Sequence, residues 1–208
     1  MDRLPAMETA TAKQRILDRA FLLAGLYGLE ALTIGHLAAD LEMSKAGVYG
    51  HFGSKQALQL ATIQRAREQF RRDIIEPAEA VPDGVARLWA MATALTSYHS
   101  ETGLHGGDFW VTVAKEYDAR QGPVREAIEA AMGWWMRRLE ALISTSVSLG
   151  QLNPCDPAQL AFEIQALLDA GGHVYRLYHD AKAPVRTRTA IRHRLEHNRG
   201  PRFPNLTD

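Results

Sequence analysis

Apolar positions recur along most of this chain at the three- and four-residue spacing of an α-helix. The first such segment runs from Thr11 to Tyr27, and its apolar stripe consists of Ile16, Ala20, Leu23 and Ala24. Thr11 and Gln14 have the spacing of a capping box, and Gly28 can end the helix with a positive φ. Sustained alternation of apolar and polar residues, which would indicate strands, is absent. The pattern predicts an all-α protein.

Two short helices are predicted next, at Ile34–Leu41 and Lys45–His51, with Thr33 and Ser44 as their N-caps. Two short helices joined by a few residues are typical of a helix-turn-helix unit. In such a turn, glycine is usual at the position that Glu42 holds here, because φ is positive there. We therefore expect Glu42 to cost about 1 kcal/mol of stability.

The second of these helices carries few large apolar side chains, so it could approach DNA closely. Its sequence from Lys45 onward includes Ala46, Gly47, Tyr49 and Gly50. Donors to phosphate oxygens are available on Ser44, Lys45, Tyr49, His51 and Lys55. On this pattern alone a DNA-reading helix and a small helical subdomain with a polar surface both remain open.

The three helices predicted within residues 1–54 are called the head below. Helical spacing continues beyond it, at 54–76, 83–101, 106–119, 122–149, 156–179 and 187–197. Pro77 is expected to end the first of these helices. We predict a DNA-binding domain at 1–54, a ligand-binding and dimerisation domain at 55–198, and a disordered tail at 199–208.

Net charge indicates no particular partner, because 24 Lys and Arg residues balance 24 Asp and Glu residues. Positive residues gather at 43–72 and 182–202, but such runs are more often solvated faces than binding sites. The chain has no apolar run long enough to span a membrane and no secretory signal at its start. Cys155 is the single cysteine. These features lead us to expect a cytoplasmic protein.

The stretch LTIGHLAADLEMSKAGVYGHFGSKQAL resembles the N-terminal signature of the TetR (tetracycline-repressor) family of bacterial regulators. The resemblance implies an all-α fold of about nine helices, DNA contacts from the head, and a C-terminal bundle that dimerises and holds a ligand. The resemblance implies DNA contacts from Thr33, Ser44, Lys45, Tyr49, His51 and Lys55. Ala46, Gly47 and Gly50, on the same short helix, are further candidate DNA-binding residues. Lys55 would hold a phosphate. Gly50 departs from the family, whose members often carry a large side chain there.

Large aromatic residues gather beyond the head, and such residues often line ligand cavities, although core positions are the commoner role. Our candidate pocket residues are Trp89, Tyr98, Phe109, Trp110, Trp134, Trp135, Phe162 and His173, with Asp108 as a further polar candidate. The pair Gly171-Gly172 suggests a close helix approach. We expect a homodimer through the 157–180 and 187–197 helices.

These features predict a ligand-responsive, DNA-binding transcriptional regulator, in particular a repressor released from a palindromic operator by a small apolar or amphipathic molecule. Catalytic signatures are missing, so we expect no enzyme activity, cofactor or metal site. The protein would be bacterial and associated with the nucleoid. An alternative is an all-α small-molecule-binding or enzymatic bundle whose head contacts another protein.

Overall fold

A computed structural model describes residues 11–101 and 109–206 of the chain. These residues form helices, and their one β-type contact is an isolated bridge between Leu152 and Arg199. The all-α prediction is therefore confirmed. The chain divides into two compact units, the first from Met1–Arg67 and Phe109–Ile128, the second from Glu68–Asp108 and Glu129–Asp208. Among the described helices, none is long and apolar enough to cross a membrane.

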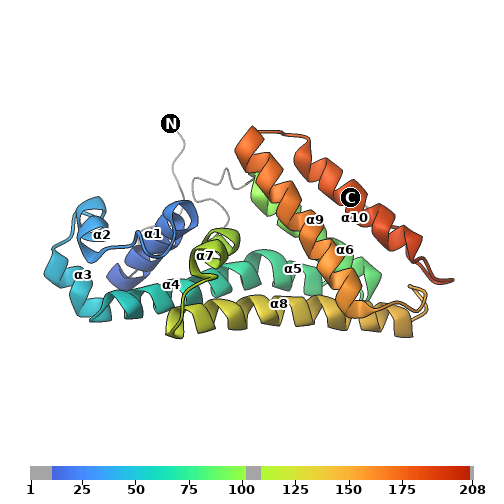
Figure 1. Ribbon diagram of the computed structural model, residues 1–208, viewed down its shortest axis with the longest axis horizontal. Coiled ribbons are helices and arrows are strands. Elements are labelled where there is room, and N and C mark those ends of the chain that lie inside the picture. Colours follow the sequence, from blue (N-terminus) through green and yellow to red (C-terminus); the bar gives the residue numbers. More distant parts are fainter. Residues whose placement is uncertain (1–10, 102–108, 207–208) are drawn as a thin grey trace. The chain divides into compact units, whose positions relative to one another are not determined.

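Unit 1 contains α1 (Ala12–Tyr27), α2 (Ile34–Asp40), α3 (Lys45–Phe52), most of α4 (Lys55–Phe70) and α7 (Phe109–Tyr117) (Figure 1). The capping box at the start of α1 is confirmed, because Thr11 Oγ1 accepts from the Gln14 N–H and Gln14 Oε1 accepts from the Thr11 N–H. At the other end of α1, Gly28 has a φ of +87°. Local sequence signals thus set both ends of this helix.

Helix α7 packs on α1 although about 85 residues separate them in the sequence. The rings of Phe21 and Phe109 lie 5.4 Å apart, and Thr112 Oγ1 donates to the Gly25 carbonyl over 3.0 Å. That carbonyl belongs to the last turn of α1, where helix carbonyls lack partners within the helix. A segment remote in sequence therefore completes the core of unit 1.

The fourth helix does not end at Pro77 as predicted. After α4 the chain forms a π-helical turn, η1 (Arg71–Ile75), and continues as α5 (Glu76–Glu79), with Pro77 in its first turn. Proline lacks an N–H and is tolerated in the first turn of a helix. Because the π-helical turn interrupts the regular α-helical bonding just before it, Pro77 begins a new turn instead of ending the helix.

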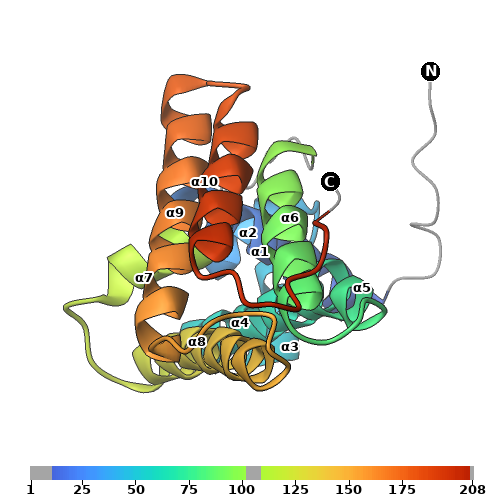
Figure 2. The same ribbon diagram turned by 90° about the vertical axis from the view of Figure 1, so that its right-hand side faces the viewer.

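Unit 2 contains α6 (Val85–Glu101), most of α8 (Pro123–Ser148), α9 (Pro157–Tyr178) and α10 (Ala183–His197). Helices α6, α9 and α10 pack against one another, as both views show (Figures 1 and 2). Asp156 caps α9, accepting from the Ala158 and Gln159 N–H groups. The core is aliphatic apart from two tryptophans; its members include Leu88, Trp89, Met91, Trp135, Leu142, Ile143, Ile164, Ile191 and Leu195.

The close approach of helices predicted from Gly171-Gly172 is confirmed. A Cβ atom on Gly171 would overlap the hydroxyl of Thr187, which lies on α10 and is 6% exposed. Helix α10 begins at Ala183, earlier than the predicted Thr187, because Pro184 fits its first turn. The two helices therefore touch along more of their length than the predicted boundaries imply.

Residues 199–206 differ from the disordered tail that the polar sequence predicts. The Gly200 N–H donates to the Gln151 carbonyl and the Arg202 N–H to the Gly150 carbonyl, each over 2.9 Å. Phe203 and Leu206 pack against the core of unit 2. Two apolar side chains and a short run of backbone bonds hold the segment in place.

Candidate DNA-binding interface

Helix α3 is short and is held by one buried side chain. Ser44 Oγ accepts from the Gly47 N–H over 3.0 Å at the N-terminus, and Gly53 ends the helix in the left-handed conformation. Val48 is fully buried and anchors the helix to the rest of unit 1. With one inward anchor in eight residues, most of the surface of α3 stays available for a partner.

The turn between α2 and α3 has the geometry predicted for a helix-turn-helix. Glu42 adopts a φ of +54°, as expected for a position where glycine is usual. The Met43 N–H donates to the Ala38 carbonyl over 2.8 Å and closes the turn. Ala38 is 2% exposed, and its small side chain lets the two helices meet.

The candidate DNA-binding residues are mostly exposed. Lys45, Ala46, Tyr49 and Gly50 are exposed on α3 and recur at the spacing of a single helix face. The other exposed candidates are Thr33, Ser44 and His51, whereas Gly47 and Lys55 are half-buried. Tyr49 is 54% exposed, which is high for so large a side chain. The structure thus presents an exposed face of small residues with a lysine and a protruding phenol.

Lys45 is oriented by a glycine on the neighbouring helix. A Cβ atom on Gly35 would lie 3.3 Å from Lys45 Cε, so the lysine stem rests against the bare backbone of α2. Gly50, in contrast, has no atom within 4 Å of its missing Cβ. On this face of α3, Lys45 therefore rests on the neighbouring helix, whereas the space beside Gly50 is empty.

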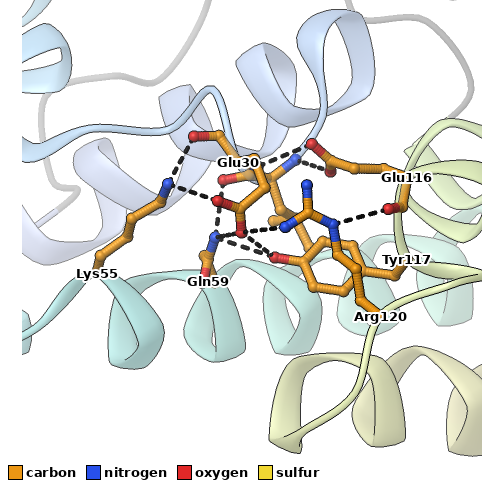
Figure 3. A network of polar contacts seen from close by, with 7 residues as sticks. Glu30, Lys55, Gln59, Glu116, Tyr117 and Arg120 are labelled. Carbon is orange, nitrogen blue, oxygen red and sulfur yellow. Dashed lines mark hydrogen bonds and ion pairs between the residues drawn. The ribbon is translucent and has the colours of Figure 1, made fainter.

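Lys55 lies at the start of α4, and its ammonium makes hydrogen bonds within unit 1 (Figure 3). Its ammonium donates to the Glu30 carbonyl over 2.7 Å and to Glu30 Oε2 over 3.0 Å. The other carboxylate oxygen, Glu30 Oε1, accepts from the Tyr117 hydroxyl over 2.5 Å and from Gln59 Nε2 over 3.0 Å. Glu30 therefore joins the head to α7 through its two oxygens.

A second carboxylate from α7 binds the backbone beside Glu30 (Figure 3). Glu116 accepts from the N–H groups of Leu29 and Glu30, over 2.6 and 3.1 Å. Arg120 donates from Nε to the Glu116 carbonyl over 3.0 Å, and its guanidinium lies over the Tyr117 ring. These contacts fix the turn that follows α1.

These contacts shift the pKa values of Glu30 and Tyr117. Hydrogen bonds from Tyr117 and Lys55 lower the pKa of Glu30 to about 2. Burial and the bond to Glu30 raise the pKa of the Tyr117 hydroxyl far above its ordinary value. Glu30 is therefore an anion and Tyr117 a neutral donor across the physiological range.

Sequence reasoning missed Glu30, Gln59 and Glu116. Nor does any local pattern indicate that Tyr117 contacts the head. Glu30 and Tyr117 lie 87 positions apart, so no local spacing rule pairs them. The one local signal was Gly28, whose missing side chain leaves room for the Glu116 carboxylate.

Comparison with known families agrees with this geometry. Residues 16–62 match the family described as bacterial regulatory proteins, tetR family. Residues 84–191 match the tetracyclin repressor-like C-terminal domain, and this match alone covers more than half of the 208 residues. The chain belongs to the TetR family.

Solved structures of other proteins share the fold. A TetR transcriptional regulator from Chloroflexus aurantiacus is 24% identical, with a TM-score of 0.82, and the match covers 90% of this chain and 96% of that one. A putative transcriptional regulator from Saccharomonospora viridis, solved with choline, is 22% identical, with a TM-score of 0.78 and coverages of 92% and 98%. AibR, solved with isovaleryl coenzyme A and operator DNA, is 21% identical, with a TM-score of 0.68 and coverages of 85% and 94%. No curated protein matches the chain.

The candidate pocket residues of this TetR-family protein are divided between the two units. Phe109 and Trp110 belong to unit 1, whereas the other candidates belong to unit 2. Trp89 and Trp135 are buried in the core of unit 2, with Tyr98 packed against it. Phe162, Trp134 and His173 are exposed. Asp108 lies outside the described residues.

A water-sized hollow lies between α6, α9 and α10 in this TetR-family protein. It is lined by Thr96, Gly171, Gly172, Tyr175, Pro184 and Thr187, and it contains none of the candidate pocket residues. It is far smaller than the several hundred cubic ångströms of a typical ligand site. In the described parts of the chain, no three His, Cys, Asp or Glu side chains are grouped to hold a metal ion.

The basic C-terminal segment of this TetR-family protein has contacts within unit 2. Arg192 lies 4.9 Å from the Trp89 ring centroid, and Arg188 donates to Thr96 Oγ1 over 3.1 Å. Arg194 pairs with Glu163 on α9. These side chains attach α10 to its neighbours, so the positive run has an internal structural role.

Proposed function

We propose that this chain is a transcriptional repressor that binds a palindromic operator as a homodimer and is released by a small molecule. Membership of a family of DNA-binding regulators supports the general role. The observation that carries the finer proposal is the exposed face of α3, with Ser44 capping the helix, Lys45 resting on Gly35, and Tyr49 protruding. Small residues between these donors would let the helix enter a major groove.

In this proposal the contacts are divided by chemistry. Lys45 and Tyr49 would face the groove, and Thr33, Ser44 and His51 would hold phosphates on its borders. Gly50 would let the backbone approach but supply no side-chain contact. Base readout would therefore depend on few side chains, with phosphate contacts supplying much of the affinity.

A second copy of the chain is the proposed partner for the outer faces of α9 and α10. Phe162, Leu177 and Tyr178 are 63%, 57% and 69% exposed on α9, and Val185 is 55% exposed on α10. Between Phe162 and Leu177, Ala166 and Ala170 occupy the same helix face. An apolar helix face with small residues at its centre suits close packing against its own copy about a two-fold axis.

The proposed ligand is a small apolar or amphipathic molecule that binds within the C-terminal half. The choline and isovaleryl coenzyme A complexes of two proteins with this fold support a ligand-binding role. To act, the ligand must bind the DNA-free state more tightly than the DNA-bound state. Quaternary amines and short-chain acyl-CoA thioesters are suitable first probes.

Operator binding is tested by a mobility-shift assay on the DNA that flanks the gene. Affinity should fall steeply with salt, and Lys45→Ala should reduce the slope of log K against log salt by about 0.9. Ser44→Ala should weaken binding about five-fold through the lost cap and phosphate contact. The matched control is Arg137→Ala, which removes one exposed positive charge from α8. Salt-independent binding, or no binding to any palindrome there, would contradict the proposal.

Repression and dimerisation have separate tests. Deleting the gene should raise transcription from the operator-bearing promoter, and a fall would indicate an activator instead. Leu177→Glu should convert a dimer to a monomer in sedimentation experiments, because it places two carboxylates in an apolar contact. Leu149→Glu, at an exposed site on the turn after α8, is the control and should leave the dimer intact.

A further inference from the structure

The ammonium of Lys55 already has an anionic partner inside the protein. Two of its three hydrogens are directed to Glu30, one to the carbonyl over 2.7 Å and one to Oε2 over 3.0 Å. A phosphate at the same ammonium would have to share it with this carboxylate. Lys55 is therefore unlike Lys45, for which no ion pair with an acidic side chain is found among the described residues.

Glu30 is held in place by groups other than Lys55. Tyr117 and Gln59 both donate to Glu30 Oε1, which leaves Oε2 directed at the lysine (Figure 3). Gln59 is 4% exposed and also donates to the Leu29 carbonyl over 3.0 Å. Because these donors are fixed by packing, the carboxylate does not need Lys55 to keep its orientation.

We propose that Glu30 acts as an internal substitute for a DNA phosphate at Lys55, and so limits the sequence-independent affinity of the head for DNA. The inference rests on the proposed function. A lysine that is already neutralised releases few additional counterions when it meets DNA, so it adds little to non-specific binding. Only a complex whose other contacts hold a phosphate firmly against Lys55 gains from displacing the carboxylate.

Tyr117 gives this contact a link to the C-terminal half. The residue lies on α7, within the segment that matches the C-terminal domain of the family, yet its hydroxyl reaches Glu30 in the head. Movement of α7 would withdraw a donor from Glu30 and loosen the carboxylate that Lys55 shares. The availability of Lys55 to DNA is thus set by a residue outside the head.

The test is Glu30→Gln, which keeps the shape and the acceptor oxygen but removes the charge. Binding to a random-sequence duplex is measured by fluorescence anisotropy over a range of salt concentrations. We expect non-specific affinity to rise about two- to five-fold and the salt slope to steepen by about 0.9. Glu42→Gln is the matched control, because it removes one exposed carboxylate from the same head without touching Lys55. An equal gain in both variants would overturn the inference.

Lys55→Ala provides the second arm. In the Glu30→Gln background it should abolish the gain, because the freed ammonium is its source. If the double variant keeps the gain in non-specific affinity and salt slope, Lys55 is not its source and the inference fails. Tyr117→Phe should give part of the Glu30→Gln effect. It also serves as the substitute if Glu30→Gln does not fold, and an unchanged slope in this variant would then count against the inference.

The two proposals fail in different ways. If the wild type shows no salt-dependent binding to any duplex, the proposed DNA-binding function fails. If the wild type binds with a steep slope that Lys45→Ala reduces, while Glu30→Gln matches the wild type, only the role of Glu30 fails.

Discussion

The Glu116 carboxylate occupies the space that a side chain on Gly28 would fill. A Cβ atom there would lie 2.5 Å from Glu116 Oε1, and the same carboxylate accepts the N–H groups of Leu29 and Glu30. Gly28 thus serves two purposes, because its φ of +87° also turns the chain away from α1. The turn after α1 therefore leaves room for a carboxylate that α7 supplies.

We therefore expect Gly28→Ala to destabilise the protein by about 2 kcal/mol or more, through backbone strain and displacement of Glu116. Gly53→Ala is the matched control, because Gly53 also has a positive φ, +71°, but nothing lies within 4 Å of its missing Cβ. It should cost only the strain, about 1 kcal/mol. The measurement is urea unfolding followed by circular dichroism. Equal losses would show that the Glu116 contact contributes nothing.

Glu42→Gly should stabilise the protein by about 0.5 to 1 kcal/mol, because glycine adopts the φ of +54° without a Cβ clash. Glu42→Ala removes the same charge but keeps the clash, so it should give no such gain. Thermal unfolding of the two variants separates the backbone effect from the charge effect. A gain in the alanine variant would point to charge repulsion.

The hydrogen bonds to Glu30 should make the free energy of unfolding depend on pH. The pKa of Glu30 is about 2 in the folded protein and 4.5 as its ordinary value, so the folded state binds its proton less readily. The stabilisation is therefore complete above pH 4.5 and is lost as the pH falls towards 2. The guanidinium of Arg194 lowers the pKa of Glu163 too, so the wild-type loss has more than one source.

Tyr117→Phe isolates the share that belongs to Glu30, because the Tyr117 hydroxyl is the largest cause of its low pKa. Between pH 6 and pH 3, the variant should lose less unfolding free energy than the wild type in urea titrations. Tyr27→Phe is the control, because Tyr27 is 63% exposed. If both variants follow the wild-type pH dependence, Tyr117 does not set the acidity of Glu30.

Gly171→Ala should destabilise unit 2 by about 1 to 3 kcal/mol, because the new methyl group would overlap Thr187 on α10. Gly133→Ala is the matched control on α8, since only the flexible end of Arg137 is near its missing Cβ. That change should be neutral or stabilising by up to about 1 kcal/mol, through helix propensity. Combining Gly171→Ala with Thr187→Ala should recover part of the loss. If the double variant is no more stable than Gly171→Ala, the overlap with Thr187 is not the cause of the loss.

The sequence by itself determined the local structure of this protein. The caps at Thr11, Thr33, Ser44 and Asp156 and the positive φ of Glu42 all follow from residues within a few positions of one another. Such interactions depend on helix geometry alone, so spacing along the chain is enough to predict them. The family could also be inferred from the sequence, because the residues that carry the resemblance lie in one contiguous stretch of the head.

Only the tertiary structure decided which distant side chains meet. The pairing of Lys55 with a carboxylate that Tyr117 holds, the attachment of Arg192 to Trp89, and the burial of Trp135 depend on where whole helices pack. The exposed positions of Phe162 and Trp134, candidates for a pocket by composition, depend on the same packing. Apolar periodicity tells which face of a helix is buried but not against what, because the hydrophobic effect has no direction.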